Sequence, residues 1–299
     1  MSSQPKKVYL ITGCSSGLGN ALARAALAAG HTVIATSRRP PNNLVEIQSL
    51  GDIKWATLDV SSPHLEIQIT ETILPLAGGK IDVLINNAGI ANAAVLEDAD
   101  LNAARAVLET NFWGAMRLTK LAVGLMRKQG QGQGQGSGGT IVNISSSTSL
   151  APMPLISVYS ASKAAVDGFT TALAAEVAPF NIRVLLVTPG GIRTSFIENN
   201  AAASGGVVAS LRAEYEGTPA EFVLRHLQEP ENFRVDPERA AGMVVQAVDG
   251  TGPFEGNSKE TLRLPLGGET LGVLEGKIAE FRGAMEGFSD IARSVDLIE

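Results

Sequence analysis

The chain has 299 residues, of which 44% are hydrophobic, and its formal net charge is -6. This apolar fraction is enough for one large core, and the acidic balance argues against a generic nucleic-acid surface. The single cysteine, Cys14, excludes an intrachain disulfide and with it a disulfide-stapled secreted fold.

Short β-branched runs alternate with longer runs rich in alanine and leucine. The first run, 7–12, predicts a buried strand, and 18–30 predicts a helix that ends at Gly30. Further strands are expected at 32–37, 53–60, 81–89, 140–145 and 181–190, and further helices at 44–50, 63–77, 102–128 and 159–180. Because helices separate strands that are apolar on both faces, we expect an α/β fold with a doubly wound parallel sheet. This is a Rossmann-type, three-layer α/β/α sandwich.

Two regions interrupt this rhythm. Residues 131–139 are rich in glycine and glutamine, which predicts a flexible surface loop without a function of its own. Residues 194–236 show no clear strand and follow a strand end, where ligands bind in open α/β sheets, so we expect a substrate lid there.

The rest of the chain resumes the alternation. A helix is expected at 237–248, a last strand at 262–267 and a helical C-terminal extension at about 266–299. Because no linker or repeat divides the chain, we expect residues 1–299 to form one domain.

Three glycines, Gly13, Gly17 and Gly19, lie between the first strand and the first helix. Glycine permits a tight turn and lets backbone N–H groups approach a pyrophosphate, whose charge then faces the helix N-terminus. A bare glycine triplet is compatible with a plain turn, but this position indicates an NAD(P)-binding site. The spacing is G-x-x-x-G-x-G rather than G-x-G-x-x-G.

That spacing resembles the opening of the short-chain dehydrogenase/reductase family, in its shorter-chained branch. Further segments resemble the family's motifs in the same order: LDV (58–60), NNAG (86–89), TNFWG (110–114), IVNISS (141–146), YSASK (159–163) and PGGIRT (189–194). The chain also loosely resembles the 17β-hydroxysteroid-type and acyl-dihydroxyacetone-phosphate-type reductases of that family.

The resemblance implies a nicotinamide dinucleotide cofactor, with Asp59 near the adenine ring and Thr194 near the carboxamide or phosphate. The residues expected to contact the cofactor are Gly13, Ser15, Ser16, Gly17, Leu18, Gly19, Ser37, Arg38, Asp59, Val60, Asn87, Ala88, Gly89, Tyr159, Lys163, Pro189, Gly190, Ile192 and Thr194. Gly191 stands where the family often has a bulky residue, which would loosen the nicotinamide pocket.

The end of the 32–37 strand indicates which dinucleotide binds. An NAD-preferring site keeps an acid there for the ribose 2′-hydroxyl, whereas this chain has Ser37 followed by Arg38. A guanidinium can bind a 2′-phosphate bidentately, so we expect NADP(H), selected mainly by Arg38. Arg39 is equally compatible with ordinary surface charge. Ser15 and Ser16 stand where some NADP-users place a basic residue.

Tyr159 and Lys163 are four residues apart on a predicted helix, so they project from one face. A free phenol has a pKa of about 10. A nearby ammonium and a helix N-terminus favour the phenolate, which would make Tyr159 an acid/base group. Such a pair can also be a contact on a solvated helix face, but the order of the motifs favours catalysis.

The resemblance assigns two further catalytic residues. Ser146 would hold and polarise the substrate oxygen, although Ser145 or Ser147 could take its place. Asn111 would hold a water that connects Lys163 to solvent; the alternative is a solvent-facing polar residue.

We therefore expect an NADPH-dependent oxidoreductase that reduces the carbonyl of a lipophilic substrate, or runs the reverse reaction, with Tyr159 as general acid/base. The alternatives are a redox-neutral dehydratase or cyclase and a non-catalytic NADP(H)-binding regulator. The lipophilic substrate is inferred from the apolar stretch 151–158 and from these apolar lid residues: Phe196, Ile197, Val207, Val208, Leu211, Phe222 and Leu224.

The remaining expectations concern partners. The histidines, His31, His64 and His226, lack the spacing of metal ligands, and His226 is expected on the surface. We expect no nucleic-acid partner and no membrane span, and, without a signal-peptide pattern, a cytoplasmic protein. By resemblance, the helices at about 102–128 and 156–179 would pair in a homodimer or homotetramer, unless those faces are core.

Overall fold

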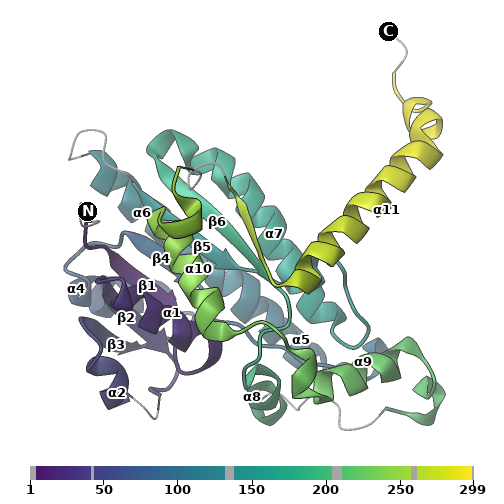
Figure 1. Ribbon diagram of the computed structural model, residues 1–299, viewed down its shortest axis with the longest axis horizontal. Coiled ribbons are helices and arrows are strands. Elements are labelled where there is room, and N and C mark those ends of the chain that lie inside the picture. The colour runs from purple at the N-terminus through teal and green to yellow at the C-terminus, as the bar shows by residue number, and fades with distance from the viewer. Residues whose placement is uncertain (1–4, 42–43, 132–137, 204–210, 257–260, 298–299) are drawn as a thin grey trace.

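A seven-stranded sheet forms the centre of the protein, with strand order β3-β2-β1-β4-β5-β6-β7 (Figure 1). The computed structural model describes residues 5–41, 44–131, 138–203, 211–256 and 261–297. Its strands are β1 (Val8–Thr12), β2 (Thr32–Ser37), β3 (Ile53–Thr57), β4 (Val83–Asn86), β5 (Gly139–Ile144), β6 (Ile182–Pro189) and β7 (Arg263–Leu266). All neighbouring strands are parallel, which confirms the predicted Rossmann-type sheet.

Helices cover both faces of the sheet, each over its own apolar core (Figure 1). One face carries α1 (Gly17–Ala28), α2 (Leu44–Gln48) and α10 (Pro237–Asp249). The other face carries α3 (Leu65–Gln68), α4 (Leu74–Leu76), α6 (Ala115–Gln131) and α7 (Ser157–Val177). Burial of both faces explains why the strands are apolar throughout.

The helix predicted at 102–128 contains a wider turn that the sequence did not reveal. It consists of α5 (Leu101–Leu108), a π-helical turn over Glu109–Gly114, and α6. A Cβ added at Gly114 would lie 2.9 Å from the Val60 side chain, so this turn packs closely against the loop that follows β3. π-Helical turns inside α-helices are frequent at functional sites.

The expected lid, 194–236, consists of α8 (Phe196–Ala203), α9 (Pro219–Gln228) and two short 3₁₀ turns at Ala213–Tyr215 and Pro230–Asn232. Its described part has no strand, only an isolated bridge between Ile192 and Val235. Val223, Leu224 and Leu227 pack in a third apolar cluster that joins the lid to the body. Val207, Val208 and residues 132–137 of the expected glycine-rich loop lie outside the described residues.

The predicted C-terminal helical extension is α11 (Gly268–Arg293), which begins directly after β7 and projects from the body (Figure 1). Within the part of the chain described here, no helix is both long and apolar enough to cross a membrane.

Candidate active site

A cavity of about 1310 Å³ opens where the parallel strands end, lined by residues that follow β1, β2, β3, β4, β5 and β6. Strand order reverses between β1 and β4, so the cavity lies at the switch point of the sheet. Open α/β sheets bind their ligands at this position.

The glycine turn after β1 forms one wall of the cavity. Gly13 and Gly17 have φ angles of +73° and +57°, in the left-handed region that favours glycine. A Cβ added at Gly19 would lie 2.1 Å from the Gly13 carbonyl oxygen, so that position accepts no side chain. Asn87 supports the turn, since its Nδ2 donates to the Thr12 carbonyl at 2.8 Å and the Gly13 carbonyl at 3.3 Å. The turn thus presents the α1 N-terminus to the cavity, an arrangement that fits a pyrophosphate.

Every residue predicted to contact the cofactor lines this cavity. Asp59 is held in place because its Oδ1 accepts hydrogen bonds from the Ser61 N–H at 2.9 Å and the Ser61 hydroxyl at 2.6 Å. Ser37 is buried and donates to the Arg39 carbonyl. Arg38 is exposed and lines the cavity, but Arg39 lines it as well. The structure therefore places two guanidinium groups where the sequence favoured one.

A chain of buried amides links the sheet to two helices next to the NNAG segment. Asn86 Nδ2 donates to Thr119 Oγ1 at 2.9 Å and to Asn143 Oδ1 at 2.8 Å, and Asn143 Nδ2 donates to Thr170 Oγ1 at 2.9 Å. These bonds tie β4 and β5 to α6 and α7. In the NNAG segment, Asn86 therefore stabilises the sheet while Asn87 faces the cofactor side.

Tyr159, Lys163 and Ser146 all line the same cavity. Lys163 Nζ lies 5.7 Å from the centroid of the Tyr159 ring and donates to the Ile144 carbonyl at 2.8 Å. The Ser146 hydroxyl hydrogen-bonds the Tyr159 phenol and also accepts a bond from Thr148 Oγ1 at 3.0 Å. A phenol, a hydroxyl and an ammonium thus converge at one point, the arrangement that proton transfer to a carbonyl oxygen requires.

The neighbouring serines are placed differently. β5 ends at Ile144, so the strict alternation of a strand no longer separates Ser145 from Ser146. Ser145 is nevertheless committed elsewhere, because its hydroxyl hydrogen-bonds the Asp167 carboxylate. Ser147 begins the 3₁₀ turn that follows. Of the three serines, Ser146 has the contact with Tyr159 that the predicted role needs.

Burial sets the protonation of the pair. It raises the pKa of Tyr159 to about 12, against the lowering effect of the Ser146 hydrogen bond. It lowers the pKa of Lys163 to about 8, against the raising effect of Asp167. Burial, rather than the neighbouring ammonium of Lys163, is thus the largest influence on the Tyr159 pKa in this structure. Shielding from water keeps the phenol protonated.

Asn111 lies behind the cavity wall. It is 2% exposed, which excludes a solvent-facing role. Its Oδ1 accepts from the Ile90 N–H at 2.8 Å, while its Nδ2 donates to the Ile90 carbonyl at 2.9 Å and Ser162 Oγ at 3.0 Å. A Cβ added at Gly89 would lie 3.3 Å from Asn111 Oδ1 and 3.7 Å from Lys163 Nζ. The amide thus sits close to the ammonium, and its predicted water relay stays a prediction.

Several residues that line the cavity lie outside the sequence motifs and were not predicted. Glu269 and Val273 reach the cavity from the first turns of α11, and the Glu269 carboxylate accepts a hydrogen bond from the Gly191 N–H. A Cβ added at Gly191 would lie 3.0 Å from Phe233, so neighbours fill the space that was expected to loosen the pocket. His226, which is half-buried, also lines the cavity, 6.1 Å from the Phe233 ring. Only the folded chain brings these late segments to the site.

The part of the cavity next to Tyr159 is apolar. The Phe196 ring lies 6.2 Å from the Tyr159 ring. The other apolar side chains of this wall are Met153, Ile156, Ile197, Leu227 and Phe233. Among the lid residues expected here, Leu211 and Leu224 instead pack in the third apolar cluster. Phe222 is 73% exposed, so its expected place in the pocket is wrong.

A dinucleotide-type glycine turn facing a tyrosine–lysine pair at the switch point of a parallel sheet defines a nucleotide-dependent oxidoreductase. Residues 7–204 match the family described as short chain dehydrogenase. The chain therefore belongs to the short-chain dehydrogenase/reductase family, whose members use NAD(P)(H). Within the described ranges, no group of three histidine, cysteine, aspartate or glutamate side chains could hold a metal ion.

Similar proteins cover nearly the whole chain. Oxidoreductase BOA17 of Botryotinia fuckeliana is 34% identical over 94% of this chain and 95% of its own. A 3-ketodihydrosphingosine reductase of Bacteroides thetaiotaomicron is 33% identical over 82% of this chain and 84% of its own. The crystal structure of a short-chain dehydrogenase from Streptomyces avermitilis superposes with a TM-score of 0.80 at 33% identity, covering 99% of this chain and all of that one.

Proposed function

We propose that this protein is a cytoplasmic, NADPH-dependent reductase that converts a ketone or aldehyde on a lipophilic molecule to the alcohol. The observation that carries the proposal is the apolar wall of Phe196, Ile197, Met153 and Ile156 on the same side of the cavity as Tyr159. A polar substrate would lose its hydration against this wall without gaining hydrogen bonds.

The cofactor preference rests on the end of β2. Positions 37 and 38 are a serine and an arginine, so neither offers a carboxylate that would repel a 2′-phosphate. The exposed Arg38 and Arg39 both line the cavity there. Arginine binds phosphate through two parallel hydrogen bonds, which a ribose 2′-hydroxyl cannot offer. This charge arrangement supports NADPH over NADH.

The dinucleotide supplies a hydride from its nicotinamide C4 to the substrate carbonyl carbon when it is bound. Ser146 orients the carbonyl oxygen, and Tyr159 gives that oxygen its phenolic proton. Lys163 holds a positive charge beside the phenol while the proton leaves, so the developing phenolate is stabilised. The Ile144 carbonyl fixes Lys163 in this position through its 2.8 Å hydrogen bond.

Burial favours the reductive direction. A phenol whose pKa is about 12 is protonated at neutral pH, the form that donates to a carbonyl oxygen. Alcohol oxidation needs the phenolate instead, which the same burial disfavours. The similarity to a 3-ketodihydrosphingosine reductase supports a ketone flanked by an alkyl chain as the substrate class.

The experiment that tests the proposal is a carbonyl panel with purified protein, run in parallel with NADPH and NADH. A homologous series of 2-ketones of increasing chain length tests whether the alkyl chain contacts the apolar wall. We expect kcat/KM to rise with each added carbon and to be higher with NADPH. Equal turnover of short polar ketones and long ones would refute the lipophilic substrate.

The same panel separates the two alternatives. A redox-neutral enzyme would convert its substrate without a change in NADPH absorbance. A cofactor-sensing regulator would bind NADPH without turnover, and Tyr159→Phe would leave its effect intact. The intact Ser146, Tyr159 and Lys163 set supports the reductase instead.

A further inference from the structure

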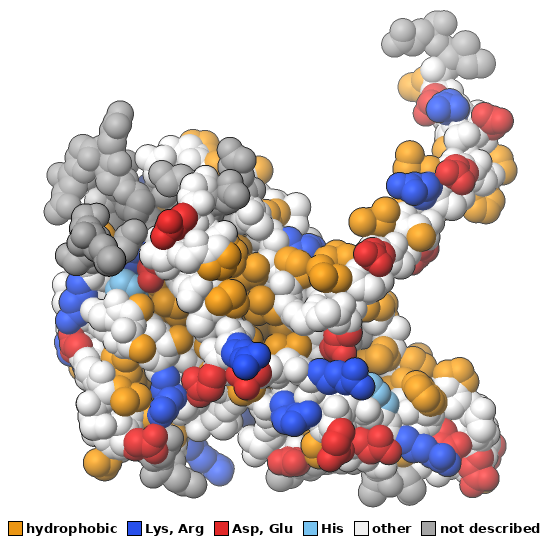
Figure 2. All heavy atoms as spheres, in the orientation of Figure 1, with side chains coloured by type: hydrophobic (Ala, Val, Ile, Leu, Met, Phe, Trp, Pro, Cys, Tyr) orange, Lys and Arg blue, Asp and Glu red, His pale blue; other side chains and the backbone are white. Residues whose placement is uncertain are grey.

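The C-terminal helix α11 carries an apolar face that is exposed beyond its first turns, where the helix projects from the rest of the described chain (Figure 1). The helix has 26 residues, a length of about 39 Å at 1.5 Å per residue. Large side chains stand free along it, with Met285 72% exposed and Phe288 61% exposed. Figure 2 shows hydrophobic side chains interspersed with charged ones along the projecting helix.

One row of apolar residues on α11 recurs at alternating intervals of three and four, while Val273 and Ile291 lie outside it. We call this row the seam; it comprises Leu271, Leu274, Ile278, Phe281, Met285, Phe288, Ala292 and, just past the helix end, Val295. An interval that averages 3.5 residues keeps the row straight along a supercoiled partner, which is the pattern of a coiled coil. A helix packed on a globular core shows a broader apolar stripe with a period of 3.6.

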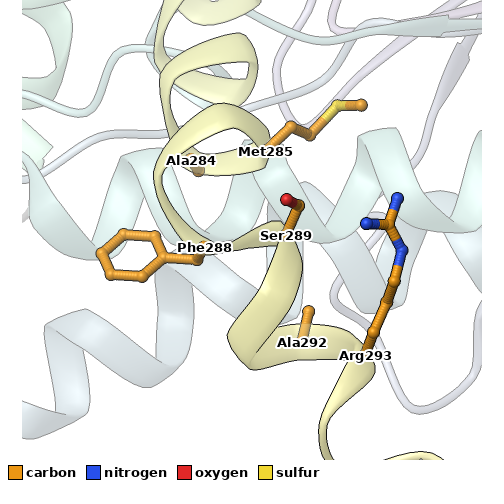
Figure 3. A pocket seen from close by; sticks show the side chains of 6 residues that line it. All are labelled: Ala284, Met285, Phe288, Ser289, Ala292 and Arg293. Atoms are coloured by element: carbon orange, nitrogen blue, oxygen red, sulfur yellow. The ribbon is translucent and has the colours of Figure 1, made fainter.

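A surface hollow on α11 is lined by this helix alone among the described residues. Its lining consists of six side chains, all from α11 itself: Ala284, Met285, Phe288, Ser289, Ala292 and Arg293 (Figure 3). Gly276, Gly283 and Gly287 lie outside the seam, and a Cβ added at any of them would meet nothing within 4 Å. Glycine weakens an exposed helix, and most helical stability in proteins comes from the packing of an apolar face. The helix therefore needs a contact that stabilises it.

The flanking charges select the partner and its direction. We propose that α11 pairs with α11 of a second copy of this chain in an antiparallel coiled coil centred between Ala279 and Glu280. In this register Ile278 faces Phe281 of the second copy, and Leu274 faces Met285. Glu275 then lies beside Arg282 of the second copy, and the twofold symmetry repeats the pair.

Other arrangements place like charges together or leave the seam without a match. A parallel pair sets Lys277 beside Arg282 of the second helix, which is repulsive. Shifting the antiparallel register by one heptad sets Arg282 against itself or Glu275 against itself. A membrane surface is disfavoured because the described helix is acidic: Glu269, Glu275, Glu280, Glu286 and Asp290 outnumber Lys277, Arg282 and Arg293. Charge complementarity thus favours a second copy.

The first test measures the mass of the full-length protein by sedimentation velocity. Phe281→Glu places a charge in the seam, and we expect it to halve the mass of the wild-type assembly. Ala279→Glu, two residues away on the outer face, is the matched control and should leave the mass unchanged. Circular dichroism of both variants should match wild type apart from α11, because both positions are exposed. An unchanged mass for Phe281→Glu overturns the proposal, even if other helices hold the protein as a dimer.

The second test reads the direction. Glu275→Arg and Arg282→Glu each create two repulsive pairs in the antiparallel register, so each should raise the dimer Kd about tenfold. The double variant restores both pairs and should return to within about threefold of wild type. In a parallel pair Arg282→Glu would tighten association instead, which would overturn the antiparallel arrangement.

The third test addresses a lipid surface. Vesicles of phosphatidylcholine with phosphatidylserine are sedimented with wild-type protein and with Phe281→Glu. We expect neither to co-sediment. Binding by wild type that Phe281→Glu abolishes without a change in mass would assign the seam to a membrane and overturn the proposal.

Discussion

Asn111 and Ile90 pair through both ends of the Asn111 amide: the Ile90 N–H donates to Oδ1 at 2.8 Å, and Nδ2 donates to the Ile90 carbonyl at 2.9 Å. The pair joins the π-helical turn to the loop after β4. That loop includes Gly89, which separates the amide from the Lys163 ammonium. Asn111 therefore supports the cavity wall from behind, and this structural role is independent of the predicted water relay.

Asn111→Ala should lower the free energy of unfolding by about 1–3 kcal/mol, because it leaves the half-buried N–H and carbonyl of Ile90 without this partner. Asn111 also bonds Ser162 Oγ, so its loss loosens the start of α7. Chemical denaturation measures the change. Asn102→Ala, on the exposed face of α5, is the control and should stay within about 0.5 kcal/mol. Equal stability of both variants would show that the pair contributes nothing.

The sequence predicted the sheet, its order of elements and the glycine turn, because these depend on local patterns. Apolar runs, turn glycines and motif spacing act within a few residues of each other. The π-helical turn around Asn111 was not predicted, because no residue pattern distinguishes it from an α-helix; in the fold Gly114 packs closely against Val60. The protonation of Tyr159 also escaped, since burial by the fold, rather than the nearby lysine, dominates it.

The outer parts of the site were the hardest to foresee. Glu269 and His226 come from segments without a motif, far along the chain from the glycine turn. Phe222 looked suited to the pocket, yet the turn of α9 points it outward while Leu227 lines the cavity. An apolar residue in a lid is expected to be buried. Only the orientation of its helix decides whether its side chain faces the substrate pocket or another part of the protein.

Tyr159→Phe should lower kcat for carbonyl reduction by about 10²- to 10⁴-fold, the usual contribution of a general acid. The ring and its contact with Phe196 remain, so the fold and the apolar wall are preserved. Steady-state kinetics with the best ketone of the panel measure the effect. Tyr215→Phe is the control, because its hydroxyl bonds Glu97 outside the cavity. Comparable activity of the two variants would remove Tyr159 from the mechanism.

The pH dependence of reduction should follow Lys163. Burial lowers its pKa to about 8, so the ammonium is present below that pH and is lost above it. Because the positive charge stabilises the developing phenolate, kcat/KM should fall as pH rises through about 8. A profile of kcat/KM between pH 6 and pH 10 would show this fall, which we call the alkaline limb. A profile that stays flat through pH 9 would mean that the lysine charge is not needed.

Asp167 should set the position of that limb. Its carboxylate raises the pKa of Lys163, so Asp167→Asn should move the limb to lower pH by about one unit. Ser149→Ala removes a 2.9 Å hydrogen bond to the same carboxylate but keeps its charge. This control should leave the limb in place. A limb that moves equally in both variants would point to a structural change rather than to the charge of Asp167.

Arg38→Ala should raise the KM for NADPH about 10- to 100-fold, the loss expected for charged hydrogen bonds to a phosphate. The KM for NADH should change less than about threefold, because a 2′-hydroxyl makes no such bonds. Arg39→Ala is the matched control: its side chain also lines the cavity, but Ser37 bonds its backbone carbonyl, which the substitution keeps. We expect a smaller loss from Arg39→Ala. Parallel losses for both cofactors in Arg38→Ala would show that this guanidinium does not select the dinucleotide.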